Sequence, residues 1–264
     1  MQHKPRRTIL SLHQLAAGLL VIFCFGEIGR SSEVTAHKRL AGAVICRKEL
    51  DKNRRELLAS KLRKISGWPD LKFDDAGILR EGKGRPVGGS KSARELLSKV
   101  LLGSNAVVLE DVSGHRDVVF MRVIPGRWKT IDGPPAFVVQ IDFADFDRVM
   151  GDEQALEAFN VGWGLLHELD HIANDSRDAT AFADAGECET RINEMRLECN
   201  LPQRIAYFYT SSPLTENTSF ATKLMRLAFE QIQPGSNKKR RYWVIWDANV
   251  IGGLDQQKEV AALR

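Results

Sequence analysis

Phe159-Asn-Val-Gly-Trp-Gly-Leu-Leu-His-Glu-Leu-Asp-His-Ile-Ala-Asn174 is the stretch that decides the fold. No proline interrupts it and its apolar residues can share one side, so it is predicted to be a helix packed against a sheet. Residues four apart lie on one helix face, so His167 and His171 can bind one metal ion. Glu168 follows the first histidine and can reach a water molecule bound to that ion, rather than the ion itself.

Two glycines, Gly162 and Gly164, precede the histidines in this predicted helix. Each weakens a helix by about 1 kcal/mol relative to alanine. Their lack of a side chain can instead let a neighbouring segment come close. The alternative interpretation of the whole stretch is a surface helix whose two histidines share a face by coincidence.

The composition is that of an ordinary soluble globular protein. The chain has 264 residues, of which 43% are hydrophobic and 27% are charged, so one or two domains with a real core are expected. The net charge is +4, and half of this excess lies in residues 1–36. This balance gives no basis for nucleic-acid binding. The short basic run Lys238-Lys-Arg-Arg241 is interpreted as a solvated loop.

Residues 1–36 are typical of an export signal. Three basic residues lie among the first seven, and Leu15 to Phe25 is an apolar run too short for a comfortable membrane span. Val34-Thr-Ala36 offers small residues for cleavage. We therefore expect a periplasmic or secreted protein. The alternative is an uncleaved N-terminal anchor, which would be the chain's only link to a membrane.

Three cysteines remain after the predicted signal: Cys46, Cys188 and Cys199. The last two are expected on one helix, about 16 Å apart along its axis, which is too far for a disulfide unless the helix breaks. Cys46 could pair with either one in an oxidising compartment. Three free thiols are the simpler alternative.

Residues 37–104 are predicted to form a helical N-terminal region. A charged helix is expected from Lys38 to Ile65, ended by Gly67-Trp-Pro69. A glycine-rich loop should follow from Asp74 to Ser90. Ser90 or Ser92 can then cap a second helix that runs to Leu102.

Residues 105–247 are predicted to form the domain that carries the metal motif. The β-rich runs Ala106–Val112 and Val118–Ile124 are separated by a short turn-rich link and are expected to form a hairpin. Ala136–Phe143 is predicted as a third strand. The expected fold class is α+β, with an antiparallel or mixed sheet of about three strands packed on the motif helix.

The chain after the motif helix is predicted to be mainly helical. We expect one helix from about Glu187 to Cys199 and an amphipathic helix from Ser219 to Ile232. Tyr242-Trp-Val-Ile-Trp246 is expected as a late strand or a packed segment. Residues 248–264 are assigned to a C-terminal tail.

A catalytic zinc site needs a third protein ligand. The acidic candidates after the second histidine are Asp175, Asp178, Asp184, Glu187, Glu189 and Glu194. Glu189 is ranked first and Glu187 second, because both open a helix that can lie against the motif helix. Asn193, four residues after Glu189, is expected to orient a ligand histidine by hydrogen bonding.

Two motifs carry a family resemblance. His167-Glu-Leu-Asp-His171, followed by Glu189-Thr-Arg-Ile-Asn193, resembles the gluzincin branch of the zinc metallopeptidases. Separately, the segment Asn193–Tyr207 is similar to the Asn-x-x-Arg-x-Glu-x-Gly-Leu-Pro-x-Arg-x-x-Tyr tail of bacterial effector-type metallopeptidases. The chain departs from the usual pattern at Ile192, where many have Glu, and at Asn200, where Gly is usual.

The resemblance implies a minimal zincin-like domain that binds one Zn²⁺ per chain and hydrolyses peptide bonds in a protein or peptide substrate. Glu168 would be the general base. Tyr207, Tyr209 and Arg204 are candidate oxyanion donors. Two alternatives stay open: a zinc-binding structural or interaction protein without activity, and a secreted toxin-like effector protease.

Overall fold

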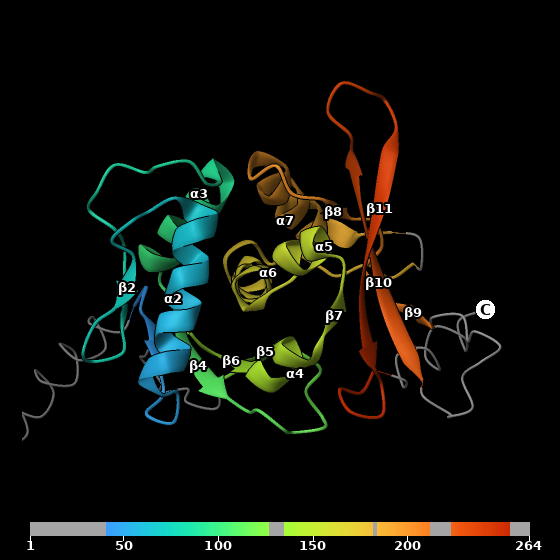
Figure 1. Ribbon diagram of the computed structural model, residues 1–264. Helices are drawn as coiled ribbons and strands as arrows, with labels where there is room; N and C mark the ends of the chain where they lie inside the picture. Colours follow the sequence, from blue (N-terminus) through green and yellow to red (C-terminus); the bar gives the residue numbers. More distant parts are fainter. Residues whose placement is uncertain (1–40, 127–134, 182–183, 212–222, 254–264) are drawn as a thin grey trace, which may run out of the picture. The chain divides into compact units, whose positions relative to one another are not determined.

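The computed structural model describes residues 41–126, 135–181, 184–211 and 223–253, all within one compact unit, Ala41–Arg264. It is an α+β protein, as predicted. Its first sheet has the strand order β1-β4-β6-β5 (Figure 1). These strands are β1 (Val44–Cys46), β4 (Ala106–Asp111), β6 (Ala136–Ile141) and β5 (Met121–Pro125). β1, β4 and β6 run parallel, whereas β5 is antiparallel to β6.

The predicted hairpin of residues 106–112 and 118–124 is wrong. β6 lies between β4 and β5, so these two strands do not pair with each other. The four consecutive residues Ala106–Leu109 are all buried. A strand covered on both faces is typical of a parallel sheet and lacks the alternation of a hairpin with one solvated face.

The two N-terminal helices are α2 (Lys52–Ser66) and α3 (Lys91–Leu101). The helix predicted from Lys38 begins too early, because β-branched Val44 and Ile45 pair with β4 as strand β1. The Asp51 side chain then caps α2 by accepting a hydrogen bond from the Arg54 amide, 2.8 Å away. Ser90 caps α3, as predicted. A short hairpin of β2 (Lys72–Phe73) and β3 (Leu79–Arg80) lies between the helices.

The predicted motif helix is α6 (Val161–Asn174). Its buried apolar side chains belong to the first hydrophobic core, which α6 shares with α2, α3, α7 and the first sheet. α6 contacts α2, α3, α7 (Gly186–Glu198) and strands β5 and β6. Two short helices, α4 (Phe143–Arg148) and α5 (Glu153–Ala158), precede it. This single core joins residues on both sides of position 104, where the sequence analysis places a domain boundary.

The two glycines of α6 allow close packing. A Cβ atom on Gly162 would lie 2.7 Å from Cβ of Lys61 in α2. On Gly164 it would lie 3.1 Å from the Phe146 ring. Gly162 thus permits the close approach of α2, and Gly164 leaves room for the side chains of Phe146 and Met121.

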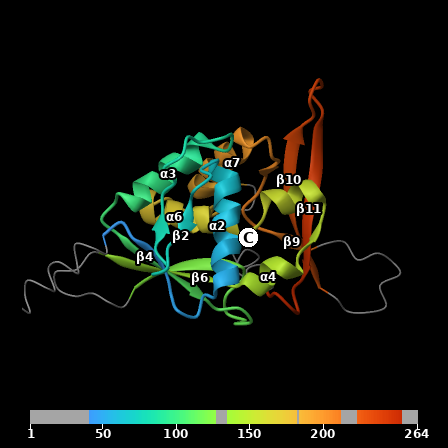
Figure 2. The same ribbon diagram turned by 60° about the vertical axis from the view of Figure 1, so that its left-hand side comes forward.

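A second sheet is built on a long antiparallel ribbon of β10 (Leu224–Ile232) and β11 (Lys239–Asp247) (Figure 2). β7 (Met150–Gly151), β8 (Gln203–Arg204) and β9 (Thr210–Ser211) pair along its edges. The predicted helix Ser219–Ile232 is therefore wrong over residues 224–232. Met225, Leu227 and Phe229 are buried while their neighbours are more exposed, which is the two-residue period of a strand. Of the two alternatives for Tyr242–Trp246, a late strand or a packed segment, the structure shows the strand, as part of β11.

The predicted export signal, residues 1–36, and the end of the predicted tail lie outside the described residues. Within the described part of the chain, no helix is long and apolar enough to cross a membrane.

Candidate metal centre

α6 presents its two histidines on one face. Asn160 caps the helix by accepting a hydrogen bond from the Gly162 amide, and Asp175 ends it in the left-handed conformation. The helix therefore ends where the sequence predicted. The ring centroids of His167 and His171 are 4.8 Å apart, one helical turn along the same face.

The Nε2 atoms of both histidines converge on one carboxylate oxygen. Asp178 Oδ1 lies 3.1 Å from His167 Nε2 and 3.4 Å from His171 Nε2. The chain can return this quickly because Asp175 adopts φ 51°, which turns the backbone sharply after α6. Asp178 was among the candidate ligands in the sequence, but it was not ranked first.

The opposite nitrogen of each ring also faces an oxygen atom. His167 Nδ1 lies 3.3 Å from Glu189 Oε2, and His171 Nδ1 lies 2.8 Å from the carbonyl oxygen of Ser176. Such partners fix the orientation of an imidazole and leave its Nε2 atom aimed at a metal position.

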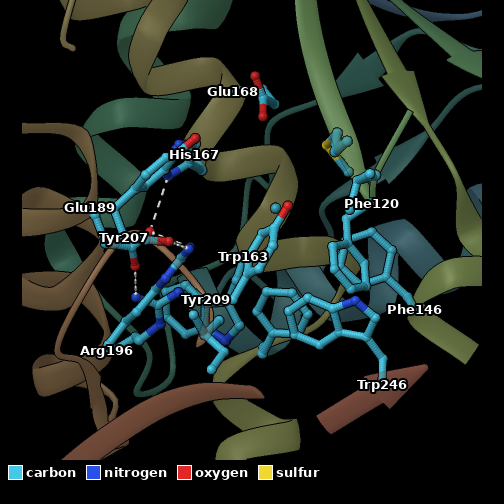
Figure 3. Close-up of a pocket in the computed structure, with 16 residues that line it drawn as sticks. Phe120, Phe146, Trp163, His167, Glu168, Glu189, Arg196, Tyr207, Tyr209 and Trp246 are labelled. Atoms are coloured by element: carbon cyan, nitrogen blue, oxygen red, sulfur yellow. Dashed lines mark hydrogen bonds and ion pairs between the residues drawn. The ribbon is translucent and has the colours of Figure 1, made fainter. Parts of the chain in front are cut away.

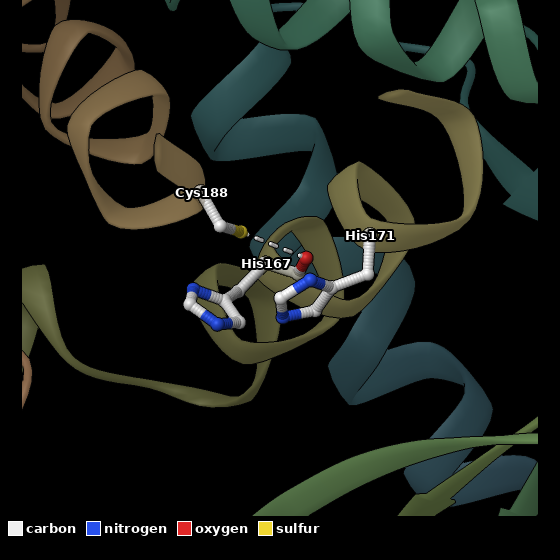
Figure 4. Close-up of side chains that lie close together, drawn as sticks. All are labelled: His167, His171 and Cys188. Atoms are coloured by element: carbon white, nitrogen blue, oxygen red, sulfur yellow. Dashed lines mark hydrogen bonds between the residues drawn. The ribbon is translucent and has the colours of Figure 1, made fainter. Parts of the chain in front are cut away.

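His167, His171 and Cys188 form a group that could hold a metal ion, with potential ligand atoms within 4.8 Å of one another. Figure 4 shows the Cys188 thiol, on α7, directed toward the two imidazoles. The thiol donates a hydrogen bond to the carbonyl oxygen of His167 over 3.3 Å, and burial raises its pKa to about 11. In the sequence Cys188 is a possible disulfide partner of Cys46 or a free thiol, and no short cysteine spacing marks it as a metal ligand. Cys46, Cys188 and Cys199 are all free thiols.

Glu189, the first-ranked ligand, lies on the Nδ1 side of His167, not at the point where the two Nε2 atoms converge. It is only 1% exposed and forms ion pairs with Arg196 and Arg204. Burial alone would raise its pKa, but the two guanidinium charges hold the pKa well below the usual value. Glu189 is therefore an ionised carboxylate that binds two arginines and supports a histidine.

The other predicted residues on α7 lie farther from the histidines. Glu187 accepts a hydrogen bond from the Arg177 amide at the start of the helix. The Asn193 side chain bonds to Arg196 and to the backbone of Arg204. Asn193 thus reaches a histidine only indirectly, by holding the two arginines that bind Glu189.

Glu168 lies beside the histidines and lines a cavity. Its side chain is buried, with an exposed fraction of 8%. Burial raises its pKa, although the charges of His167 and His171 oppose the shift. Among the described residues, no ion pair involves this carboxylate, so it is available to accept a proton.

The three candidate oxyanion donors all line the cavity that adjoins Glu168, but their contacts differ. Tyr207 stacks on His167 with ring centroids 6.0 Å apart, and its hydroxyl donates to Asp178 Oδ2 over 2.9 Å. Arg204 is bound to Glu189 and to the Tyr207 carbonyl. Tyr209 packs on Trp246 in a second hydrophobic core, which is formed mainly by α5, β10 and β11. Tyr207 is thus the one of the three that touches the histidine and aspartate cluster.

The charges in the cluster are strongly coupled. Burial would lower the pKa of His167, but hydrogen bonds to Asp178, Cys188 and Glu189 hold the pKa well above its usual value. Burial would raise the pKa of Asp178, but its bonds to both histidines lower it. The carboxylates of Asp178 and Glu189 therefore favour positive charge at the histidines.

No protein family, curated protein or solved structure matches this chain. The resemblance to zinc metallopeptidases accordingly stays a prediction, and the geometry of the described residues carries the functional argument.

Proposed function

We propose that this chain is a zinc-dependent peptidase in which His167, His171 and Asp178 hold the metal and Glu168 is the general base. The observation that carries the proposal is the convergence of both Nε2 atoms on Asp178 Oδ1, at 3.1 and 3.4 Å. Histidine and carboxylate ligands at a three-ligand site favour zinc.

The separations agree with one ion bound to all three atoms. Bonds from zinc to histidine nitrogen or carboxylate oxygen are about 2.0–2.2 Å, so two ligand atoms of a tetrahedral site are about 3.3–3.6 Å apart. Of the two separations from Asp178 Oδ1, 3.4 Å lies within this range and 3.1 Å lies just below it. Only a small adjustment of the Asp178 side chain is needed to admit the ion.

The charges of the cluster also suit a cation between these atoms. Each imidazole has oxygen neighbours at both ring nitrogens, and the pKa of each ring is raised, so both nitrogens can carry protons that these oxygens accept. A metal ion would take the place of the two Nε2 protons, while Nδ1 still donates to Glu189 in His167 and to Ser176 in His171.

Asp178 is a better third ligand than Cys188 or Glu189. The Cys188 thiol already donates to the His167 carbonyl, and Glu189 is bound by two arginines. Moving either one to the metal would break buried interactions, which costs several kcal/mol for an ion pair. Asp178 is already in place.

The chemistry follows from this arrangement. A bound zinc ion would lower the pKa of a coordinated water to about 7 and polarise the peptide carbonyl. Glu168 accepts the proton of the attacking water and delivers it to the leaving amine. Tyr207, stacked on His167, is the candidate to donate a hydrogen bond to the developing oxyanion.

An extended peptide would bind along β5. The predicted strand at 136–143, observed as β6, cannot add a peptide strand because it is paired on both sides. Among the described strands of the first sheet, β5 is paired on one side only, and its Val123 contacts Glu168. A peptide strand added at that edge would pass the general base.

The alternative of an inactive zinc-binding module predicts that the glutamate is held in an ion pair or that no space adjoins the metal. Glu168 instead lines a cavity and forms no ion pair among the described residues. This favours the peptidase. A toxin-like effector would use the same chemistry and differ only in its substrate.

The test combines metal analysis with a Glu168→Gln variant of the purified protein. We expect about one zinc per chain in both proteins and cleavage of casein by the wild type. Loss of a general base should reduce the rate by about 10²–10⁴-fold. Full activity in the variant, or absence of zinc from both proteins after purification in zinc-containing buffer, would overturn the proposal.

A further inference from the structure

A cavity of about 140 Å³ adjoins His167 and Glu168. Figure 3 shows the two residues on one side of it and a group of aromatic rings on another. Because the cavity reaches the general base, any substrate group that fills it must lie next to the reacting bond.

The aromatic wall is centred on Phe120. Its ring centroid lies 5.3 Å from Phe146, 5.0 Å from Phe159 and 5.2 Å from Trp246. Phe120 has φ 64°, an unusual conformation for a bulky residue. Asp145 Oδ2 accepts a hydrogen bond from the Phe120 amide over 3.0 Å and so stabilises this backbone conformation. The wall is therefore built in advance of any ligand.

The polar wall, from Glu189, Arg196 and Arg204, offers little to a charged ligand. Glu189 is paired with both arginines. Arg196 also donates to the Ala158 carbonyl, and its guanidinium lies 5.4 Å above the Trp163 ring. Since these charges are already bound to one another, the aromatic wall is the part of the cavity that remains to contact a neutral occupant.

We propose that this cavity binds the side chain of a substrate residue adjacent to the cleaved bond, and that this residue is aromatic. The proposal rests on the peptidase function for its catalytic meaning. An apolar cavity of about 150 Å³ in another protein accommodates benzene, so 140 Å³ suits a single six-membered ring. Offset and edge-on contacts with the surrounding rings would add to the burial of apolar area.

A binding experiment tests the cavity without cleavage. N-acetyl-L-phenylalanine amide is titrated into ¹⁵N-tryptophan-labelled Glu168→Gln protein, with N-acetyl-L-alanine amide as the control. Trp163 and Trp246 line the cavity, whereas Trp68 and Trp243 do not. We expect the indole signals of the first pair to shift with the phenylalanine amide alone, and those of Trp68 and Trp243 to stay in place.

A cleavage experiment tests the preference. The zinc-loaded wild type is incubated with a mixture of synthetic peptides of varied sequence, and the cut sites are mapped by mass spectrometry. We expect aromatic residues to be enriched on one consistent side of the cut. The ratio kcat/KM should be about tenfold to hundredfold higher than for alanine at that position, as burial of one aromatic side chain implies.

Two variants change the cavity in opposite directions. Gly164→Ala adds a methyl group 3.1 Å from the Phe146 ring, a contact that the flexible neighbours can relax. It should move the preference from aromatic toward smaller apolar residues. Phe146→Ala enlarges the cavity and should favour tryptophan over phenylalanine. Phe73→Ala, in the first core and away from the cavity, is the matched control and should leave the preference unchanged.

The outcomes separate the two proposals. If no peptide is cut but the Trp163 and Trp246 signals shift, the peptidase function fails and the aromatic site stands. If peptides are cut without aromatic enrichment and both signals stay in place, the aromatic site is overturned and the peptidase function stands. A preference that is the same in Gly164→Ala, Phe146→Ala and the wild type would also overturn the site.

Discussion

Glu189 faces His167 across the contact of α7 with α6, with Oε2 3.3 Å from Nδ1. The same carboxylate forms ion pairs with Arg196 and Arg204, and it is almost fully buried. One residue thus links the position of a proposed metal ligand to the stability of the helix pair.

Glu189→Gln should destabilise the protein by about 3–5 kcal/mol, because it leaves the buried charge of Arg196 without its main partner. Urea unfolding followed by circular dichroism measures this change. Glu230→Gln removes a carboxylate that pairs with half-exposed Arg241, and it should cost no more than about 1 kcal/mol. Equal losses in the two variants would contradict the assigned role of Glu189.

Asp178→Asn should lose zinc that the wild type retains on dialysis, since an amide is a much poorer ligand than a carboxylate. Asp175→Asn is the matched control, because asparagine tolerates the left-handed conformation at that position. Zinc per chain is measured by elemental mass spectrometry. Wild-type zinc retention in Asp178→Asn would remove Asp178 from the ligand set.

Cys188→Ser should keep its zinc, because the serine hydroxyl can still donate to the His167 carbonyl that the thiol contacts. Competition with a chromophoric chelator gives the zinc affinity of each variant. The opposite pattern, a Cys188→Ser protein that loses zinc beside an Asp178→Asn protein that keeps it, would assign the third ligand position to the cysteine.

Asp145 gives a prediction for the dependence of stability on pH. Burial raises its pKa from 3.8 to about 6 in the folded protein. Between these two values the folded state binds more protons than the unfolded state, so this group lowers stability as the pH rises through the window. Above pH 6 the folded protein carries the full cost of the buried charge.

Asp145→Asn retains an acceptor for the Phe120 amide but does not titrate. Its stability relative to the wild type should therefore rise between pH 4 and pH 6 and level off above that. Urea midpoints at pH 4, 5, 6 and 7 for both proteins test this. Parallel pH profiles for the two proteins would show that Asp145 does not have the raised pKa.

The sequence predicted what local patterns determine. The motif helix, its end at Asn174 and the capping by Ser90 follow from helical spacing and from residues that satisfy free amides. The pairing of β4 with β6 could not be predicted in the same way, because β5 lies between these two strands in the sequence. The segment at 224–232 has apolar residues that fit either a helix or a strand, and only its pairing with β11 decides between them.

The proposed change of third ligand from Glu189 to Asp178 has a related reason. Glu189 has the right residue type on a helix that does pack against α6, so sequence reasoning favoured it. The sequence pattern did not show that Glu189 forms ion pairs with Arg196 and Arg204. Nor did it display the sharp turn at Asp175 that brings Asp178 back to the histidines.

That turn has a consequence for how such a centre is inherited. With Asp175 reversing the backbone, the proposed base and all three proposed ligands fall within one uninterrupted stretch, His167 to Asp178. A centre encoded so compactly can persist while the surrounding sheets and loops diverge. Distant relatives are therefore best sought by the spacing His-Glu-x-x-His, six intervening residues, Asp, with a residue that tolerates left-handed backbone four places after the second histidine.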